Sequence, residues 1–337
     1  MLRLILCSLI FSSCSMGVIK SGGDHKYLYD PTVSYRSDEL AELSSQVVTA
    51  SQKDPQSGKL SSLFGKGQKA IKRIGIVVFE TEIQPTRDGL SKLDKIYLSS
   101  AGKQIITENF LRLWEQSIKV LGTELDFVSS AKIKKSKSFH QYGSEVEDVI
   151  LSKRSILAPD DIFFLGNGKN TTMATVMNPR GMRDLSLLLV PAYELMGGPK
   201  WSEHQKQFIN DVSKELHLDA VIIVMSSVSW TAAHIDKHSG ENISEEIRVK
   251  LQSSILLPFT NYHERLTNLK IKDQPNTTLC FRSYESELRI PFTITLPSEL
   301  ETFDTIESEL LNPMFKTYKD LAQMTIMNQI VDLKKTW

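Results

Sequence analysis

Two histidines and an aspartate stand at alternate positions in one short stretch, as His234, Asp236 and His238. On an extended segment alternate side chains project to one side, so two imidazoles and a carboxylate could converge on a metal ion. The stretch lies in a polar loop between two expected strands, with Ser239-Gly240 as its turn, and His263 could approach it across a hairpin. A solvated loop is the favoured interpretation, and a metal site is the alternative.

Other arrangements that could do chemistry are incomplete. The stretch from Gly166 to Thr171 resembles a phosphate-binding loop, but Phe163 stands where that motif needs glycine and Asn170 where it needs Ser or Thr. No Gly-x-Ser-x-Gly elbow accompanies the histidines, so a serine triad is not indicated. The sequence therefore predicts no catalytic residue and no cofactor, points to no small-molecule substrate, and favours a protein that is not an enzyme.

The most specific pattern is at the N-terminus. A basic start at Arg3 is followed by an apolar run from Leu4 to Phe11 and by Ser12-Ser13-Cys14. This pattern resembles a bacterial lipoprotein signal, in which the chain is cut before the cysteine of an apolar-small-small-Cys box. The resemblance implies that residues 1–13 are a signal peptide and that Cys14 carries a diacylglyceryl group and an N-acyl chain such as palmitate. The alternative is a plain secretory signal with Cys14 incidental.

The chain has three cysteines, and lipidation accounts for two of them. Cys7 would leave with the signal peptide and Cys14 would be acylated, so Cys280 remains alone and cannot form an internal disulfide. Cys280 lies in a strand-like run and is expected to be a small core residue.

A run of lysines forms the one basic cluster, at Lys132, Lys134, Lys135 and Lys137. Such a run is usually a solvated loop, and its functional alternative is contact with anionic headgroups or glycan phosphates beside a membrane. Over the whole chain 40 basic residues balance 40 acidic ones, which argues against nucleic-acid binding.

The elements that position these residues follow an α/β pattern. An amphipathic helix capped at Ser202 leads into a buried apolar run, Val221 to Met225, which is typical of a strand covered on both faces. Alternating residues from Ile247 to Phe259, and again towards Ile294, predict two long strands that pair antiparallel. The expected fold is α/β with α+β character: a mixed sheet with flanking helices and a long antiparallel β-hairpin, preceded by a disordered tether.

Composition divides the chain into three parts. After the signal peptide, residues 14–70 are polar and rich in serine and glycine, so they are expected to form a tether with one short helix from Asp38 to Thr49. Residues 71–337 are expected to form a single domain. It should begin with the strand Ile74 to Phe79, and a long helix from Leu98 to Leu121 should follow, ending at Gly122.

This order of elements resembles the superfamily of the curli-secretion lipoprotein, the TolB N-terminal domain and the lipoprotein activators of penicillin-binding proteins. The resemblance rests on the strand Ile74 to Phe79 with its helix, on the unit from Lys214 to Val224, and on the antiparallel strands after it. His217 stands where the family usually has glycine. The resemblance implies a domain that binds envelope partners or oligomerises.

These observations lead to one hypothesis with two alternatives. The protein is expected to be lipid-anchored at the outer membrane or cell surface, with its domain in the periplasm or outside the cell. Its partners would be the membrane, through the lipid, and envelope proteins or further copies of itself. The alternatives are a ring-forming secretion-channel lipoprotein and a metal-dependent envelope hydrolase that uses His234, Asp236 and His238.

Overall fold

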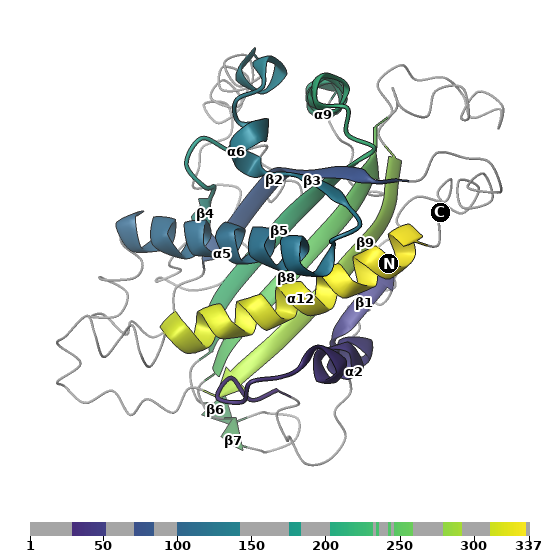
Figure 1. Ribbon diagram of the computed structural model, residues 1–337. Coiled ribbons are helices and arrows are strands. Elements are labelled where there is room, and N and C mark those ends of the chain that lie inside the picture. The colour runs from purple at the N-terminus through teal and green to yellow at the C-terminus, as the bar shows by residue number, and fades with distance from the viewer. Residues whose placement is uncertain are drawn as a thin grey trace, which may run out of the picture.

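The computed structural model describes most of the domain expected from the sequence. It covers residues 29–51, 71–83, 100–141, 175–182, 203–231, 234–235, 242–243, 246–258, 279–291 and 311–334. These residues form one mixed sheet with helices against its two faces, which confirms the expected fold class (Figure 1). None of the helices in these ranges is both long and apolar enough to cross a membrane.

The main sheet has seven strands. Their bounds are β1 (Val48–Ser51), β2 (Arg73–Ile83), β3 (Asp126–Val128), β4 (Thr175–Met177), β5 (Ala220–Thr231), β8 (Glu246–Leu257) and β9 (Leu279–Pro291). Six strands follow the order β1-β9-β8-β5-β2-β3, and β4 pairs with β2 beside that path. β2 runs parallel to β3 and β5, whereas every other pair in the sheet is antiparallel.

The long antiparallel hairpin predicted from the alternating pattern is confirmed as β8 and β9. Val249 lies opposite Leu288 and Leu251 opposite Ser286, so the apolar positions of the two strands fall on one face of the sheet. A further pair of short strands, β6 (His234–Ile235) and β7 (Asn242–Ile243), forms a separate two-stranded sheet.

Two long helices cover the first face of the sheet, α5 (Ser100–Leu121) and α12 (Asn312–Lys334) (Figure 1). Phe110 of α5 stacks flat on Tyr318 of α12, with the ring centroids 3.7 Å apart, and Phe315 meets Phe110 edge-on. Both rings of the stacked pair are fully buried, so the contact fixes one helix against the other in the centre of the core. α5 ends at the Gly122 expected from the sequence, where a Cβ would lie 2.7 Å from the Ile118 carbonyl oxygen.

The second face is covered at one end by α6 (Ser130–Ile133) and α9 (Glu203–Leu216). Their apolar side chains meet Val221 and Ile223 of β5 in a second, smaller core with Phe139 and Phe208 in it. α9 ends at Leu216, and His217 follows it with φ of 54°. The Leu218 amide donates to the Ser213 carbonyl and the His217 amide to the Lys214 carbonyl, a Schellman ending whose left-handed position normally holds glycine.

The expected tether is the clearest difference between prediction and structure. The short helix is present as α2 (Ser37–Val47), with Arg36 as its N-cap. It begins one residue earlier and ends two residues earlier than predicted, and the next four residues form the edge strand β1. Tyr29, Leu40 and Val47 are buried in the main core. The prediction of a tether from residue 14 to residue 70, with the domain beginning at residue 71, is therefore wrong for residues 29–51.

Candidate interaction surfaces

The candidate metal residues are only partly placed by the structure. His234 lies on β6, where its backbone pairs with Ile243, whereas Asp236, His238 and His263 lie outside the described residues. Within the part of the chain that the structure describes, no three His, Cys, Asp or Glu side chains come close enough together to hold a metal ion. The metal site stays a prediction, as does the lipidation of Cys14, which also lies outside the described residues.

The basic segment, residues 132–137, has a fixed backbone. Ile133 is fully buried, and the Ser130 amide donates to the Glu115 carboxylate over 2.7 Å. The Glu215 carboxylate accepts from the amides of Lys137 and Ser138, at 2.8 and 2.7 Å. Partial burial opposes ionisation of Glu215, but these hydrogen bonds outweigh it and hold the pKa of its carboxyl below the usual range.

The four lysines of the basic segment have different surroundings. Lys132, Lys135 and Lys137 are exposed, whereas the Lys134 ammonium donates to the Arg180 carbonyl oxygen. The segment therefore presents three exposed cations on a hydrogen-bonded backbone, with Lys132 in α6, Lys135 in the turn after it and Lys137 in the helical residues that follow, and not on an irregular loop. It belongs to the second face of the sheet, where Ile133 packs in the smaller core.

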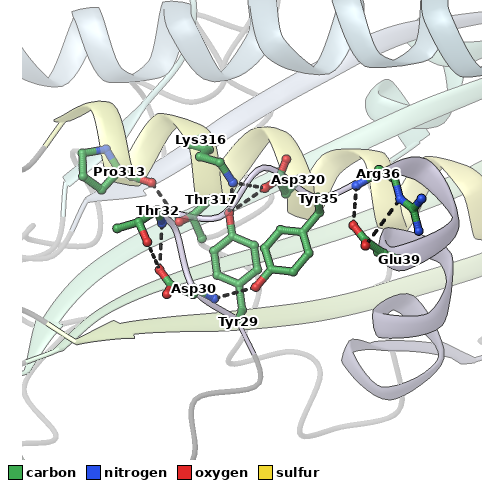
Figure 2. Close-up of polar contacts among 10 residues, drawn as sticks. All are labelled: Tyr29, Asp30, Thr32, Tyr35, Arg36, Glu39, Pro313, Lys316, Thr317 and Asp320. Atoms are coloured by element: carbon green, nitrogen blue, oxygen red, sulfur yellow. Dashed lines mark hydrogen bonds and ion pairs between the residues drawn. The ribbon is translucent and has the colours of Figure 1, made fainter.

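A polar cluster that the sequence did not indicate joins the start of the described chain to α12 (Figure 2). The Tyr29 hydroxyl donates to the Asp320 carboxylate over 2.6 Å, and the Lys316 ammonium forms an ion pair with the same carboxylate at 2.7 Å. The rings of Tyr29 and Tyr35 stack at 5.2 Å, and the Lys316 nitrogen lies 5.3 Å from the centroid of each. The Lys316 ammonium thus contacts both a carboxylate and the faces of two aromatic rings.

Hydrogen bonds around the cluster set the path of the chain that enters it. The Asp30 amide donates to the Tyr35 hydroxyl, and the Asp30 carboxylate accepts from the amide and hydroxyl of Thr32. The Glu39 carboxylate then accepts from the Arg36 amide at the start of α2. Burial, with the nearby Asp320 carboxylate adding to it, raises the pKa of Tyr29 above its ordinary value.

The rest of this segment is attached along its whole length. Asn328 of α12 donates to the Ser44 hydroxyl over 2.6 Å, and β1 pairs with β9 from Val48↔Ser286 to Ser51↔Ser283. We call residues 29–51 the N-terminal arm. The arm lies alongside α12 and supplies the last strand of the sheet, so it is part of the domain.

Helix α12 carried a signal for this arrangement. An ordinary surface helix has one apolar stripe, but α12 has apolar or small residues around most of its circumference. Twelve of its residues are buried, among them the polar Thr317, Asp320, Gln329 and Asp332. A helix of this kind needs cover beyond that given by the sheet and α5, and the arm provides part of it. What the sequence could not reveal is which segment would supply that cover.

Along β5, β8 and β9 the second face of the sheet changes from apolar to polar. Alternation along β8 and β9 turns one set of residues towards α12 and the other set to the second face. That second set is polar and forms cross-strand pairs: Lys250 with Glu287 at 3.1 Å, Gln252 with Glu285 at 3.1 Å, and Ser254 with Ser283 at 2.9 Å. We call this the open face.

The open face is ordered, and it is exposed around Lys250 and Glu285, whereas Ser283 at its other end is buried. The side chains of Lys250 and Arg289 are each 48% exposed, and both pair with Glu287. Partial burial disfavours the charged form of Glu287, but the two cations outweigh it and lower the pKa of this carboxyl. Ser227 and Ser229 of β5 continue the polar surface, and Glu80 of β2, which is fully buried, lies at its border with the apolar end.

Comparison of the chain with protein-family models, curated proteins and solved structures gave no match. The superfamily resemblance drawn from the sequence therefore stays a prediction.

Proposed function

We propose that this protein is a lipid-anchored component of a bacterial cell envelope and that it acts through protein contacts, not through catalysis. The pattern that ends at Cys14 supports the anchor. The open face supports the mode of action and is the observation that carries it. Surfaces that present fixed charges of both signs suit selective protein contact, because complementary charges speed encounter and exclude wrong partners.

The rigidity of the open face strengthens this proposal. Its residues lie on two strands of 12 and 13 residues whose opposite face is buried against α12. Side chains held in cross-strand pairs have already lost much of their rotamer freedom, so binding costs less conformational entropy. A partner, or a second copy of this chain, would therefore meet a preformed array of donors and acceptors.

The anchor is tested by fractionating bacterial cells that express the full chain. The Cys14→Ala variant should leave the membrane fraction, and the mass of the N-terminal peptide should show acyl chains on Cys14 of the wild type. Cys7→Ala is the matched control and should stay in the membrane. Retention of Cys14→Ala in the membrane fraction, or an unmodified Cys14, would remove the basis for the anchor.

The mode of action is tested by photocrosslinking in the same cells. A photoreactive residue at Gln252 on the open face should yield a discrete product, and one at the exposed Gln116 of α5 should not. Exchanging the charges, with Lys250→Glu and Glu287→Lys together, should preserve the fold but remove the product. Equal crosslinking at both positions would count against the open face. Light scattering on the detergent-solubilised protein would then distinguish a ring from a monomer.

A further inference from the structure

The N-terminal arm changes how far the domain can stand from a membrane. Tyr29 is 15 residues after Cys14, and Ile71, where the tether was expected to end, is 57 residues after it. A fully extended chain gains at most about 3.3–3.6 Å per residue, which gives a limit of about 50 Å to Tyr29 and about 190–205 Å to Ile71. Docking of the arm thus shortens the longest span roughly fourfold.

A short connection between Cys14 and Tyr29 would also restrict the orientation of the domain. Fifteen residues would span about 20 Å on average if they formed a random coil, whereas a domain of this size is about 50 Å across. A connection that is short relative to the domain turns the side from which the chain leaves towards the membrane for most of the time. A connection of 57 residues, at about 40 Å on average, would leave the domain much freer to rotate.

The contacts of the N-terminal arm define the side from which the chain leaves the domain. The chain leaves the domain at Tyr29, which is 2% exposed and held against Lys316 and Asp320 in the first turns of α12. α2 lies beside it, with Leu40 and Val47 buried against the same core. We call this side, formed by α2 and the part of α12 from Lys316 to Asn328 that faces the arm, the exit side. Figure 1 shows α2 and α6 at opposite ends of the molecule.

We propose that the docked arm makes the exit side the membrane-facing side of the domain, and that its partner there is the lipid surface carrying the anchor. The proposal rests on the lipidation of Cys14. It has a consequence for the basic segment. Lys132, Lys135 and Lys137, at the opposite end, face away from the anchoring leaflet, so any anionic surface that they contact is not that leaflet.

Energy transfer from the domain to labelled lipids tests this orientation. Cys280→Ser removes the free thiol, and single cysteines are then placed at the exposed positions Gln46 on α2 and Lys135 in the basic segment. The lipidated full-length protein, in vesicles that contain acceptor lipids, is labelled at each in turn. Because the two positions lie at opposite ends of a domain about 50 Å across, transfer from position 46 should exceed that from position 135 by about twofold or more.

A variant in which the N-terminal arm no longer docks tests whether the arm causes this orientation. Tyr29→Ala, Leu40→Asp and Val47→Asp together should free the arm. Because position 46 would move with the arm, the donor for this comparison is placed at the exposed Lys319 of α12, whose transfer should fall towards that of position 135. Val33→Ala, at a position 44% exposed in the same arm, is the matched control and should leave transfer unchanged. Hydrogen exchange should show loss of protection in residues 37–51 while β5 and β8 stay protected.

Two outcomes would overturn the proposal: equal transfer from both positions in the wild type, or a released arm with an unchanged difference. Failure of the anchor is recognised separately, from the mass of the N-terminal peptide. The same labelled variants, with a histidine tag in place of residues 1–14 and bound to nickel-chelating vesicles, measure the orientation without the lipid. Equal transfer there would show that the arm does not orient the domain, whatever happens at Cys14.

Discussion

The two faces of the β8–β9 hairpin both carry polar pairs, but in different surroundings. Towards α12, Asp332 accepts hydrogen bonds from Arg282 and from the Tyr284 hydroxyl, and Gln329 donates to Ser253 over 2.6 Å. On the open face, Lys250 and Glu287 pair at 3.1 Å, but both side chains remain partly exposed to water. The same strands thus provide two sets of pairs that differ in burial.

This difference decides what each set contributes. A buried polar group that loses its partner cannot recover a hydrogen bond from water, so breaking the pair costs the full desolvation of the group left behind. An exposed pair exchanges its partner for water at little cost. The pairs under α12 therefore fix how the helix sits on the sheet, whereas those on the open face are free to be replaced by a partner's groups.

The largest effect is expected from Asp332→Ala. This change leaves Arg282 without its ion pair and the Tyr284 hydroxyl without its acceptor in a site where Asp332 is 7% exposed. The free energy of unfolding should fall by about 3 kcal/mol, measured by urea denaturation. Asp332→Asn keeps an acceptor and should lose less. A loss below about 1 kcal/mol for the alanine variant would show that the buried pair is worth no more than an exposed one.

The second largest effect is expected from alkaline pH, which should lower the free energy of unfolding through the buried Tyr318 of α12. Burial raises the pKa of Tyr318, against the hydrogen bond with Ser226, so the folded state keeps its proton where the unfolded state loses it. The contribution of this proton to the free energy of unfolding is fully present below about pH 10. Above that pH the free energy of unfolding falls by about 1.4 kcal/mol per pH unit for each tyrosine whose pKa is raised in this way. Unfolding measured between pH 9 and pH 11 should show this slope. Tyr318→Phe should reduce it, and an identical slope in that variant would contradict the assignment.

A smaller gain is expected at the end of α9, on the second face. His217 holds a left-handed backbone conformation that costs an L-residue about 1–2 kcal/mol and glycine almost nothing. His217→Gly should therefore raise the free energy of unfolding by about 1 kcal/mol, after the greater flexibility of glycine in the unfolded chain is allowed for. His217→Ala is the control and should bring no gain. Thermal or urea unfolding measures both.

The smallest effect is expected from Glu287→Gln on the open face. Removing this charge should change the free energy of unfolding by about 0.5 kcal/mol or less, and salt should reduce the difference further. Since the pKa of Glu287 is lowered in the fold, its contribution is present above the unfolded value of about 4.3 and is lost as pH falls through the folded value. A loss comparable to that of Asp332→Ala would remove the distinction between the faces.

Prediction succeeded where local pattern decides structure. The alternation along β8 and β9, the helical spacing in α5 and α9, and the stop at Gly122 depend on neighbours a few residues away. His217 shows the limit of this information. Helical spacing does not reveal its backbone conformation, and only the structure shows that this residue is left-handed although it is not glycine.

The contacts of the N-terminal arm and the polar pairs of the open face were harder to predict, because their residues come together from distant parts of the chain. Tyr29 and Asp320 are 291 residues apart, and Lys250 meets Glu287 only once the register of β8 and β9 is set. The basic segment was visible as a run of lysines, but its rigidity comes from Glu115 and Glu215 on two other helices. None of these partners can be identified from local spacing.

The sequence by itself determined the α/β class, the long hairpin and the approximate positions of the long helices and strands, because periodic burial is written into consecutive residues. Only the tertiary structure decided that residues 29–51 belong to the domain. Their polar and serine-rich composition is that of a tether. They are ordered because α12 offers Asp320 and Asn328 as partners and β9 offers a free edge for β1. Composition measures how much a segment can bury, but whether it docks depends on the surface it meets.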